Sequence, residues 1–167
     1  LGFGVNEKVR RLMDLERQFT DTIVVSIHAN SLLPSTEPRG LQVYYGPTEA
    51  IYSDEVYEIQ QDRDVHHYGY PIERAYTYYD DAARARLAGA VFNGVKAQMP
   101  VLGSASGAGV RTGNYAVLRE NNFTNILVET GFLSNAEDRA IITDPGNQDK
   151  IAQGIANGIQ AYFTTGG

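Results

Sequence analysis

A histidine and a glutamate each end an apolar run of this chain, and both have side chains suited to chemistry. One run, Thr22-Ile-Val-Val-Ser-Ile-His28, ends in an imidazole, and the other, Asn125-Ile-Leu-Val-Glu129, ends in a carboxylate. An imidazole is a common zinc ligand, and a carboxylate beside a metal-bound water serves as a general base or acid. The two residues therefore predict a reactive site built around a metal.

His28 has two interpretations. It shares one strand face with Val24 and Ser26, and such a histidine can be a core residue that bonds a backbone carbonyl. As a metal ligand, its second ring nitrogen needs an orienting partner, and Asn30 is a candidate for polar support nearby. The residues alone leave both interpretations open.

Glu129 also has structural alternatives. A carboxylate directly after Ile-Leu-Val is rarely buried without a partner, so it could cap the next turn or pair with a cation such as Arg119. The functional interpretation is a general base or acid whose pKa is raised by burial towards the working range. Arg111 and Arg119 are candidates for binding a substrate carboxylate, with structural ion pairs as the ordinary alternative.

The two runs predict strands that deliver these side chains to one edge of a sheet. Val and Ile suit strands that are buried on both faces, and ligands of open parallel sheets bind at the carboxyl ends of the strands. Shorter strands are predicted at 41–45 and 115–119, and a Gly/Ser/Ala loop at 103–113. Helices are predicted at 5–19, from Asp80-Asp81 to Pro100, at 136–142, and, after a break at Asp144-Pro145-Gly146, around Ile151 to Tyr162. This alternation of helices and strands predicts an α/β fold.

Composition narrows the classes of protein to consider. The 167 residues fit one domain, and a net charge of -6 argues against nucleic acid or an anionic membrane as the main partner. The absence of cysteine excludes disulfides, thiolate zinc sites and a cysteine nucleophile. Neither a signal peptide nor an apolar run long enough for membrane insertion is found in these residues.

Several motifs together point to a known family. They are Val25-Ser-Ile-His28-Ala-Asn30, Gly40-Leu-Gln-Val-Tyr-Tyr45, Tyr115-Ala-Val-Leu-Arg119, Val128-Glu129-Thr-Gly-Phe-Leu-Ser-Asn135 and Asn135-Ala-Glu-Asp138. In order and spacing they resemble the zinc-dependent N-acetylmuramoyl-L-alanine amidases of the Amidase_3 type. The resemblance covers most of the chain, except for a Tyr-rich segment at 48–79.

The resemblance implies one amidase catalytic domain over residues 1–167, with a central, mostly parallel twisted sheet and helices on both faces. It implies hydrolysis of the amide between the lactyl group of N-acetylmuramic acid and the L-alanine of the peptidoglycan stem peptide. His28 matches a zinc ligand and Glu129 matches the catalytic glutamate, while Asn30 and Arg119 are expected to contact substrate. Zinc would polarise the amide carbonyl and lower the pKa of its water, and Glu129 would pass the water proton to the leaving amine.

The chain departs from the family at its amino end. Family members bind one zinc with three protein ligands, and two of these come from an N-terminal segment with an Asp-Pro-Gly-His-Gly-like turn and a Glu on the next helix. This chain has no match to either, and one imidazole does not hold a catalytic zinc. We therefore expect an N-terminally incomplete domain whose two further zinc ligands lie outside this chain. The alternative is a degenerate site.

Residues 48–79 form a Tyr-rich, acidic insertion where some family members carry a regulatory helix that covers the zinc. Our hypothesis is an autoinhibitory segment in which Glu55 or Glu58 approaches the metal, and a regulatory protein relieves this inhibition. The alternative is a loop that lines the groove for glycan and peptide.

The predicted protein is a secreted, monomeric amidase that acts on peptidoglycan in the periplasm or cell wall. The alternative is a non-catalytic peptidoglycan-binding or regulatory module on the same fold.

Overall fold

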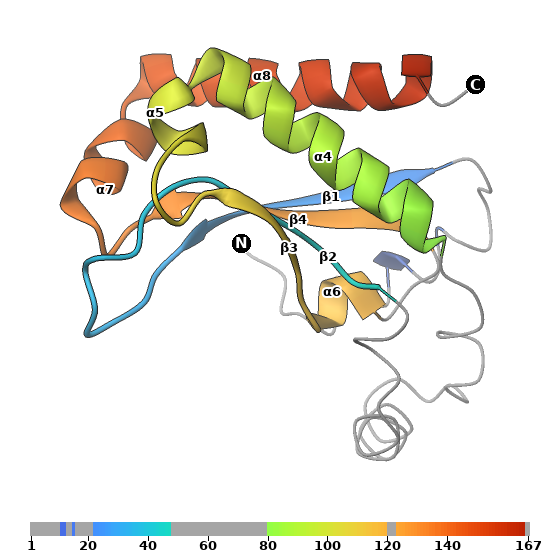
Figure 1. Ribbon diagram of the computed structural model, residues 1–167, viewed down its shortest axis with the longest axis horizontal. Helices are drawn as coiled ribbons and strands as arrows, with labels where there is room; N and C mark the ends of the chain where they lie inside the picture. Colours follow the sequence, from blue (N-terminus) through green and yellow to red (C-terminus); the bar gives the residue numbers. More distant parts are fainter. Residues whose placement is uncertain (1–10, 13–14, 16–21, 48–79, 120–122, 166–167) are drawn as a thin grey trace.

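A computed structural model describes residues 11–12, 15, 22–47, 80–119 and 123–165. Most of the helix predicted at 5–19, and the whole insertion at 48–79, lie outside the described residues. The described elements are β1 (Ile23–Asn30), β2 (Gln42–Tyr45), α4 (Asp81–Gln98), α5 (Pro100–Gly103), β3 (Gly109–Thr112), α6 (Ala116–Arg119), β4 (Thr124–Phe132), α7 (Ala136–Ile142) and α8 (Pro145–Thr165). Figure 1 shows their arrangement.

The four strands form one sheet in the order β1-β4-β2-β3. β1 is parallel to β4 and β2 is parallel to β3, whereas β2 and β4 are antiparallel. The long helices α4 and α8 pack on each other across one face of the sheet, and the short helix α6 lies at the other face (Figure 1). The predicted α/β architecture, with a mostly parallel sheet, is confirmed.

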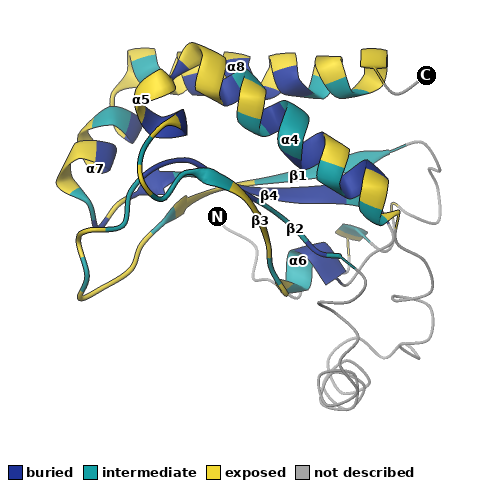
Figure 2. Ribbon diagram, viewed as in Figure 1, coloured by how far each residue is buried: buried dark blue, intermediate teal, exposed yellow. Residues whose placement is uncertain are grey.

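The hydrophobic core lies between the sheet and helices α4 and α8, where Figure 2 shows the buried residues. Its fully buried members include Leu41, Val43, Leu87, Val91, Val95, Ile126 and Val128. Ile23 and Val25 of β1 pack against the same core. Because side chains alternate along a strand, Ser26 and His28 face away from these helices.

Side-chain caps start the two helices that the sequence predicts best. The Asp80 carboxylate accepts a hydrogen bond from the amide of Ala83 at the start of α4. The Asn135 side chain accepts bonds from the Glu137 and Asp138 amides at the start of α7. Such caps satisfy amides that have no partner within the helix, which explains why both starts are visible in the sequence.

Burial of β1 on both faces is a wrong prediction. Ile27 is 58% exposed and His28 is also exposed, whereas Ile126 and Val128 of β4 are fully buried as expected. The reason is the sheet order, since β1 is the outermost strand of the described sheet and pairs there with β4 only.

Two other local predictions are wrong. Residues 115–119 contain helix α6 instead of a strand, because the amides of Leu118 and Arg119 turn back to the Tyr115 carbonyl. The loop predicted at 103–113 contains strand β3, which pairs with β2. The break predicted at Asp144-Pro145-Gly146 is confirmed, because α7 ends at Ile142. The last helix starts earlier than Ile151, since the Asp144 side chain caps the Asn147 amide and Pro145 is the first helical residue.

Candidate active site

His28 and Glu129 lie directly beside each other on neighbouring parallel strands. They are register partners of β1 and β4, so both side chains leave the same face of the sheet near the carboxyl ends of the two strands. This is the edge to which the sequence assigns them. Gln42, at the start of antiparallel β2, is the register partner of Glu129 on its other side.

A pocket of about 310 Å³ opens on this face. Its lining residues are Ser26, His28, Tyr115, Ala116, Val117, Leu127 and Glu129. Helix α6 and the residue before it supply a largely apolar wall, and the strands supply the imidazole and the carboxylate. A few polar groups in a mostly apolar pocket are typical of small-molecule and catalytic sites.

The carboxylate of Glu129 is poorly compensated. Its Oε2 atom is buried and has no hydrogen-bond partner among the residues that the structure describes. Burial raises the pKa of Glu129, because desolvation disfavours the charged form. A carboxylate that takes up a proton more readily than usual, and that lines a pocket, is suited to act as a general base and then as a general acid.

His28 is presented to solvent. Its Nε2 atom lies 2.9 Å from the Ser26 hydroxyl, and its backbone carbonyl accepts a hydrogen bond from the Thr130 hydroxyl. The interpretation of His28 as a core histidine is therefore wrong. The imidazole instead lies in the pocket wall beside Glu129, where a bound ion or substrate can reach it.

Asn30 is joined to the site through Gln42, which is not among the predicted site residues. The Oε1 atom of Gln42 accepts hydrogen bonds from the Asn30 amide at 3.2 Å and from the Tyr44 hydroxyl at 2.9 Å. Its Nε2 atom donates to the Gly107 carbonyl at 2.9 Å. Alternation along 41–45 places Gln42 and Tyr44 on one face, but it does not indicate that Asn30 and Gly107 are the partners of Gln42.

Arg119 is set apart from the pocket. Only 5% of its surface is exposed, and Nη1 donates to the backbone and side-chain oxygens of Asn114. Arg119 is not one of the pocket-lining residues, so its predicted contact with substrate stays a prediction.

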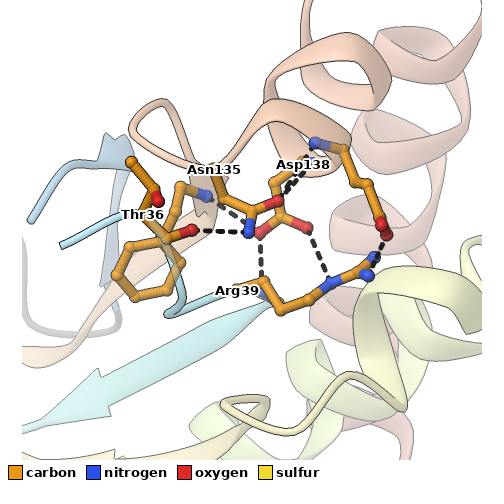
Figure 3. Close-up of polar contacts among 7 residues, drawn as sticks. Thr36, Arg39, Asn135 and Asp138 are labelled. Atoms are coloured by element: carbon orange, nitrogen blue, oxygen red, sulfur yellow. Dashed lines mark hydrogen bonds and ion pairs between the residues drawn. The ribbon is translucent and has the colours of Figure 1, made fainter.

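A buried carboxylate fixes the loop that leads from β1 to β2 (Figure 3). Oδ2 of Asp138 accepts hydrogen bonds from the amides of Gly40 and Phe132, and its Oδ1 atom lies 3.5 Å from Nε of Arg39. Asn135 donates to the Thr36 carbonyl nearby. Residues from α7 thus hold the ends of β2 and β4, which carry Gln42 and Glu129.

The described residues do not form a complete metal site. Within ranges 22–47, 80–119 and 123–165, no three His, Cys, Asp or Glu side chains cluster closely enough to hold a metal ion. A catalytic zinc needs three protein ligands, and His28 supplies one imidazole. Beside His28, the buried Oε2 of Glu129 has no hydrogen-bond partner among the described residues. Such a carboxylate is suited to proton transfer with a metal-bound water, and with His28 it would still not complete a set of three ligands.

The mixed sheet presents an imidazole beside a half-buried carboxylate at one edge, a pair of groups that can act in hydrolysis. The family model described as N-acetylmuramoyl-L-alanine amidase, Amidase_3, matches residues 5–161. The chain therefore belongs to the Amidase_3 family.

Individual relatives agree with this assignment. The chain is 40% identical over 55 residues to YrvJ of Bacillus subtilis (strain 168), which is named as an N-acetylmuramoyl-L-alanine amidase, and the match covers 33% of this chain and 11% of YrvJ. It is 38% identical over 56 residues to LytH of Staphylococcus saprophyticus, named as a cell wall amidase, with 34% of this chain and 19% of LytH covered. The matches thus span a small part of these relatives.

A solved structure shows the same fold. The catalytic domain of CwlV, an amidase from Bacillus (Paenibacillus) polymyxa var. colistinus, superposes with a TM-score of 0.66 at 24% identity, over 98% of this chain and 68% of that one. At this level of identity the likeness supports the fold alone.

Proposed function

We propose that this chain is the catalytic part of a zinc-dependent peptidoglycan amidase, which cleaves the amide between N-acetylmuramic acid and the L-alanine of the stem peptide. Family membership supports the amidase class and the peptidoglycan substrate. The observation that carries the proposal is the buried, unpartnered Oε2 of Glu129, which lies in a pocket beside His28.

In this proposal His28 is one ligand of the zinc ion, and two further ligands come from residues other than those described. A bound zinc would supply a Lewis acid for the amide carbonyl and would lower the pKa of water. His28 is well placed for this role because its ring lines the pocket next to Glu129.

Glu129 performs the proton transfers in this proposal. Its carboxylate removes a proton from the attacking water, whose oxygen forms the new bond to the amide carbon. The carbon–nitrogen bond then breaks, and the protonated Glu129 delivers its proton to the leaving amine. The products are the lactyl carboxylate of the sugar and a free amino terminus on the peptide.

The test combines peptide release from purified sacculi with elemental analysis of zinc in the full-length protein. We expect one zinc per chain and release of stem peptides. Glu129→Ala should abolish release and keep the zinc, whereas Asp149→Asn, at an exposed position of α8, should change neither. A protein that binds sacculi but contains no zinc and releases nothing would instead be a non-catalytic binding module.

The site of action is also part of the proposal. LytH is named as a cell wall amidase, which supports action on the cell wall outside the cytoplasm. Of the helices in the described ranges, none combines the length and apolar character needed to cross a membrane.

A further inference from the structure

Arg111 of β3 stands in the same row of side chains as the pocket. Register pairs connect Ser26 to Leu127, Leu127 to Tyr44, and Tyr44 to Arg111. Paired residues on neighbouring strands present their side chains to the same face, so this row crosses the whole sheet on the face of Glu129. Ser26 and Leu127 line the pocket, and Arg111 ends the row on the far side.

The guanidinium of Arg111 is available to a ligand. Arg111 is exposed, and its Nη2 atom donates to the Gly107 carbonyl at 3.0 Å. No carboxylate of the described ranges forms an ion pair with it. A guanidinium has five N–H donors, so one bond to a carbonyl leaves donors free for a carboxylate.

The carbonyl that holds Arg111 is itself held firmly. Gly107 O also accepts the bond from Nε2 of Gln42. A side chain at Gly107 would place its Cβ 2.5 Å from the Arg39 carbonyl oxygen. The backbone at Gly107 therefore packs closely against the loop between β1 and β2, which Asp138 holds. Arg111 and Gln42 are therefore oriented by the same backbone atom.

Two tyrosines join the pocket to Arg111. The rings of Tyr44 and Tyr115 pack edge to face, with centroids 5.2 Å apart, and Tyr115 lines the pocket with Glu129. Burial is the main cause of a raised pKa at Tyr44, followed by the charge and the hydrogen bond of Tyr115, while the charge of Arg111 lowers it. The surface between Glu129 and Arg111 thus carries two phenol rings and ends in a cation.

The span of this surface suits a short peptide. Strand β2 separates β4 from β3, so two strand spacings, or about 10 Å, lie between these strands, and Arg111 is offset by two residues from the row of Glu129, which makes the backbone separation about 12 Å. An extended peptide advances about 3.3 Å per residue, and the Arg111 side chain turns back to the Gly107 carbonyl, so two or three residues bring a carboxylate within its reach. A peptide whose first amide lies at Glu129 would bring the carboxylate of its second or third residue to Arg111.

We propose that Arg111 binds a carboxylate of the stem peptide, so that the leaving peptide lies over β2 and β3 and the sugar side of the substrate lies towards β1. This assignment rests on the proposed amidase function. It gives Arg111 the role of a specificity-determining residue.

The test measures binding of two probes by calorimetry, so it does not depend on turnover. The probes are L-alanyl-D-glutamate and the same dipeptide with both carboxyl groups as carboxamides. We expect the full-length protein to bind the acid about fivefold more tightly, as an exposed but partly oriented ion pair allows. Arg111→Gln should remove this preference, and Arg111→Lys should retain part of it.

Arg139→Gln is the matched control, because Arg139 is also exposed and also donates to a backbone carbonyl, that of Leu133. It should leave the preference unchanged. Equal affinity for the two probes, a preference that survives Arg111→Gln, or no binding of either probe at millimolar concentration would overturn the assignment.

Sacculus digestion separates this outcome from failure of the proposed function. Peptide release without a charge preference would refute the role of Arg111 and keep the amidase. A charge preference that Arg111→Gln removes, in a protein that releases nothing, would keep the carboxylate site and refute the hydrolysis.

Discussion

The burial that would suit Glu129 to proton transfer also makes its charged form destabilising to the fold. Burial raises its pKa above the ordinary value of 4.5, so the folded protein retains a proton at pH values where the unfolded chain has lost it. Because the folded state then binds more protons than the unfolded state, stability falls as the pH rises from about 4.5 through the raised pKa. At neutral pH the charged carboxylate is therefore a cost to folding.

Glu129→Gln should stabilise the protein at pH 7. A neutral amide avoids the desolvation cost of the charge, and we expect a gain of about 0.5–1 kcal/mol in the free energy of unfolding, kept small because the pocket admits solvent. Urea denaturation at pH 7 and pH 4 measures the gain, which should shrink at the lower pH. A variant less stable than wild type at pH 7 would contradict this account.

The proposed role of Glu129 also predicts an acid limit of activity. A general base must be deprotonated, so peptide release should decline on acidification as the carboxylate takes up a proton. The pH profile of kcat/KM on soluble muropeptides tests this expectation. A profile without an acid limb would assign the base to another group.

At the scale of elements, the contact between α4 and α8 depends on missing side chains. A Cβ at Gly154 of α8 would lie 2.6 Å from Cα of Val95 in α4, whereas a Cβ at Gly89 of α4 would meet nothing within 4 Å. The two helix axes can approach closely because Gly154, like Gly94 and Gly158 at the same contact, carries no side chain.

This difference predicts opposite effects for one substitution. Gly154→Ala should destabilise the fold by about 1–3 kcal/mol through overpacking. Gly89→Ala should stabilise it by about 0.5–1 kcal/mol, because alanine loses less backbone freedom in a helix. Thermal denaturation of the two variants measures the contrast, and equal effects would show that the helices separate to accept the methyl group.

Elements with local signals could be predicted from the sequence. Helices α4 and α7 begin where Asp80 and Asn135 cap them, and a cap involves residues only two or three positions apart. Strand β3 depends on pairing with β2, which lies more than sixty residues away along the chain. The Gly-rich residues around β3 are typical of a loop, so no local pattern indicates a strand there. Helix α6 is a single turn, which is too short for any periodic pattern.

In the candidate site, too, some residues could be predicted from the sequence and others could not. His28 and Glu129 could be brought together from the sequence, because parallel strands end at one edge and each residue ends the apolar run of such a strand. Gln42 could not be assigned a role, since its partners Asn30 and Gly107 are distant in sequence and carry no common motif. The exposure of β1 depends on the sheet order, which strand patterns alone do not encode.

At the scale of the whole molecule, the insertion is the element whose role is open to the most direct test. Deleting residues 48–73 from the full-length protein should raise peptide release if the acidic segment is autoinhibitory, since a competing carboxylate near the metal would be removed. Release rates from sacculi measure this, with circular dichroism as the control for folding. Unchanged or lost activity in a folded variant would favour a substrate-lining loop.

The carboxylate of Asp138 links the start of β2 to the end of β4, so we expect these two strand ends to open together. The amides of Gly40 and Phe132 share its Oδ2 atom as acceptor, so neither can be exposed to solvent without disturbing the other. In hydrogen exchange, the two amides should therefore exchange slowly and at similar rates, as members of one cooperative opening unit. Asp138→Asn should accelerate both together, whereas unequal acceleration would show that the two strand ends open independently.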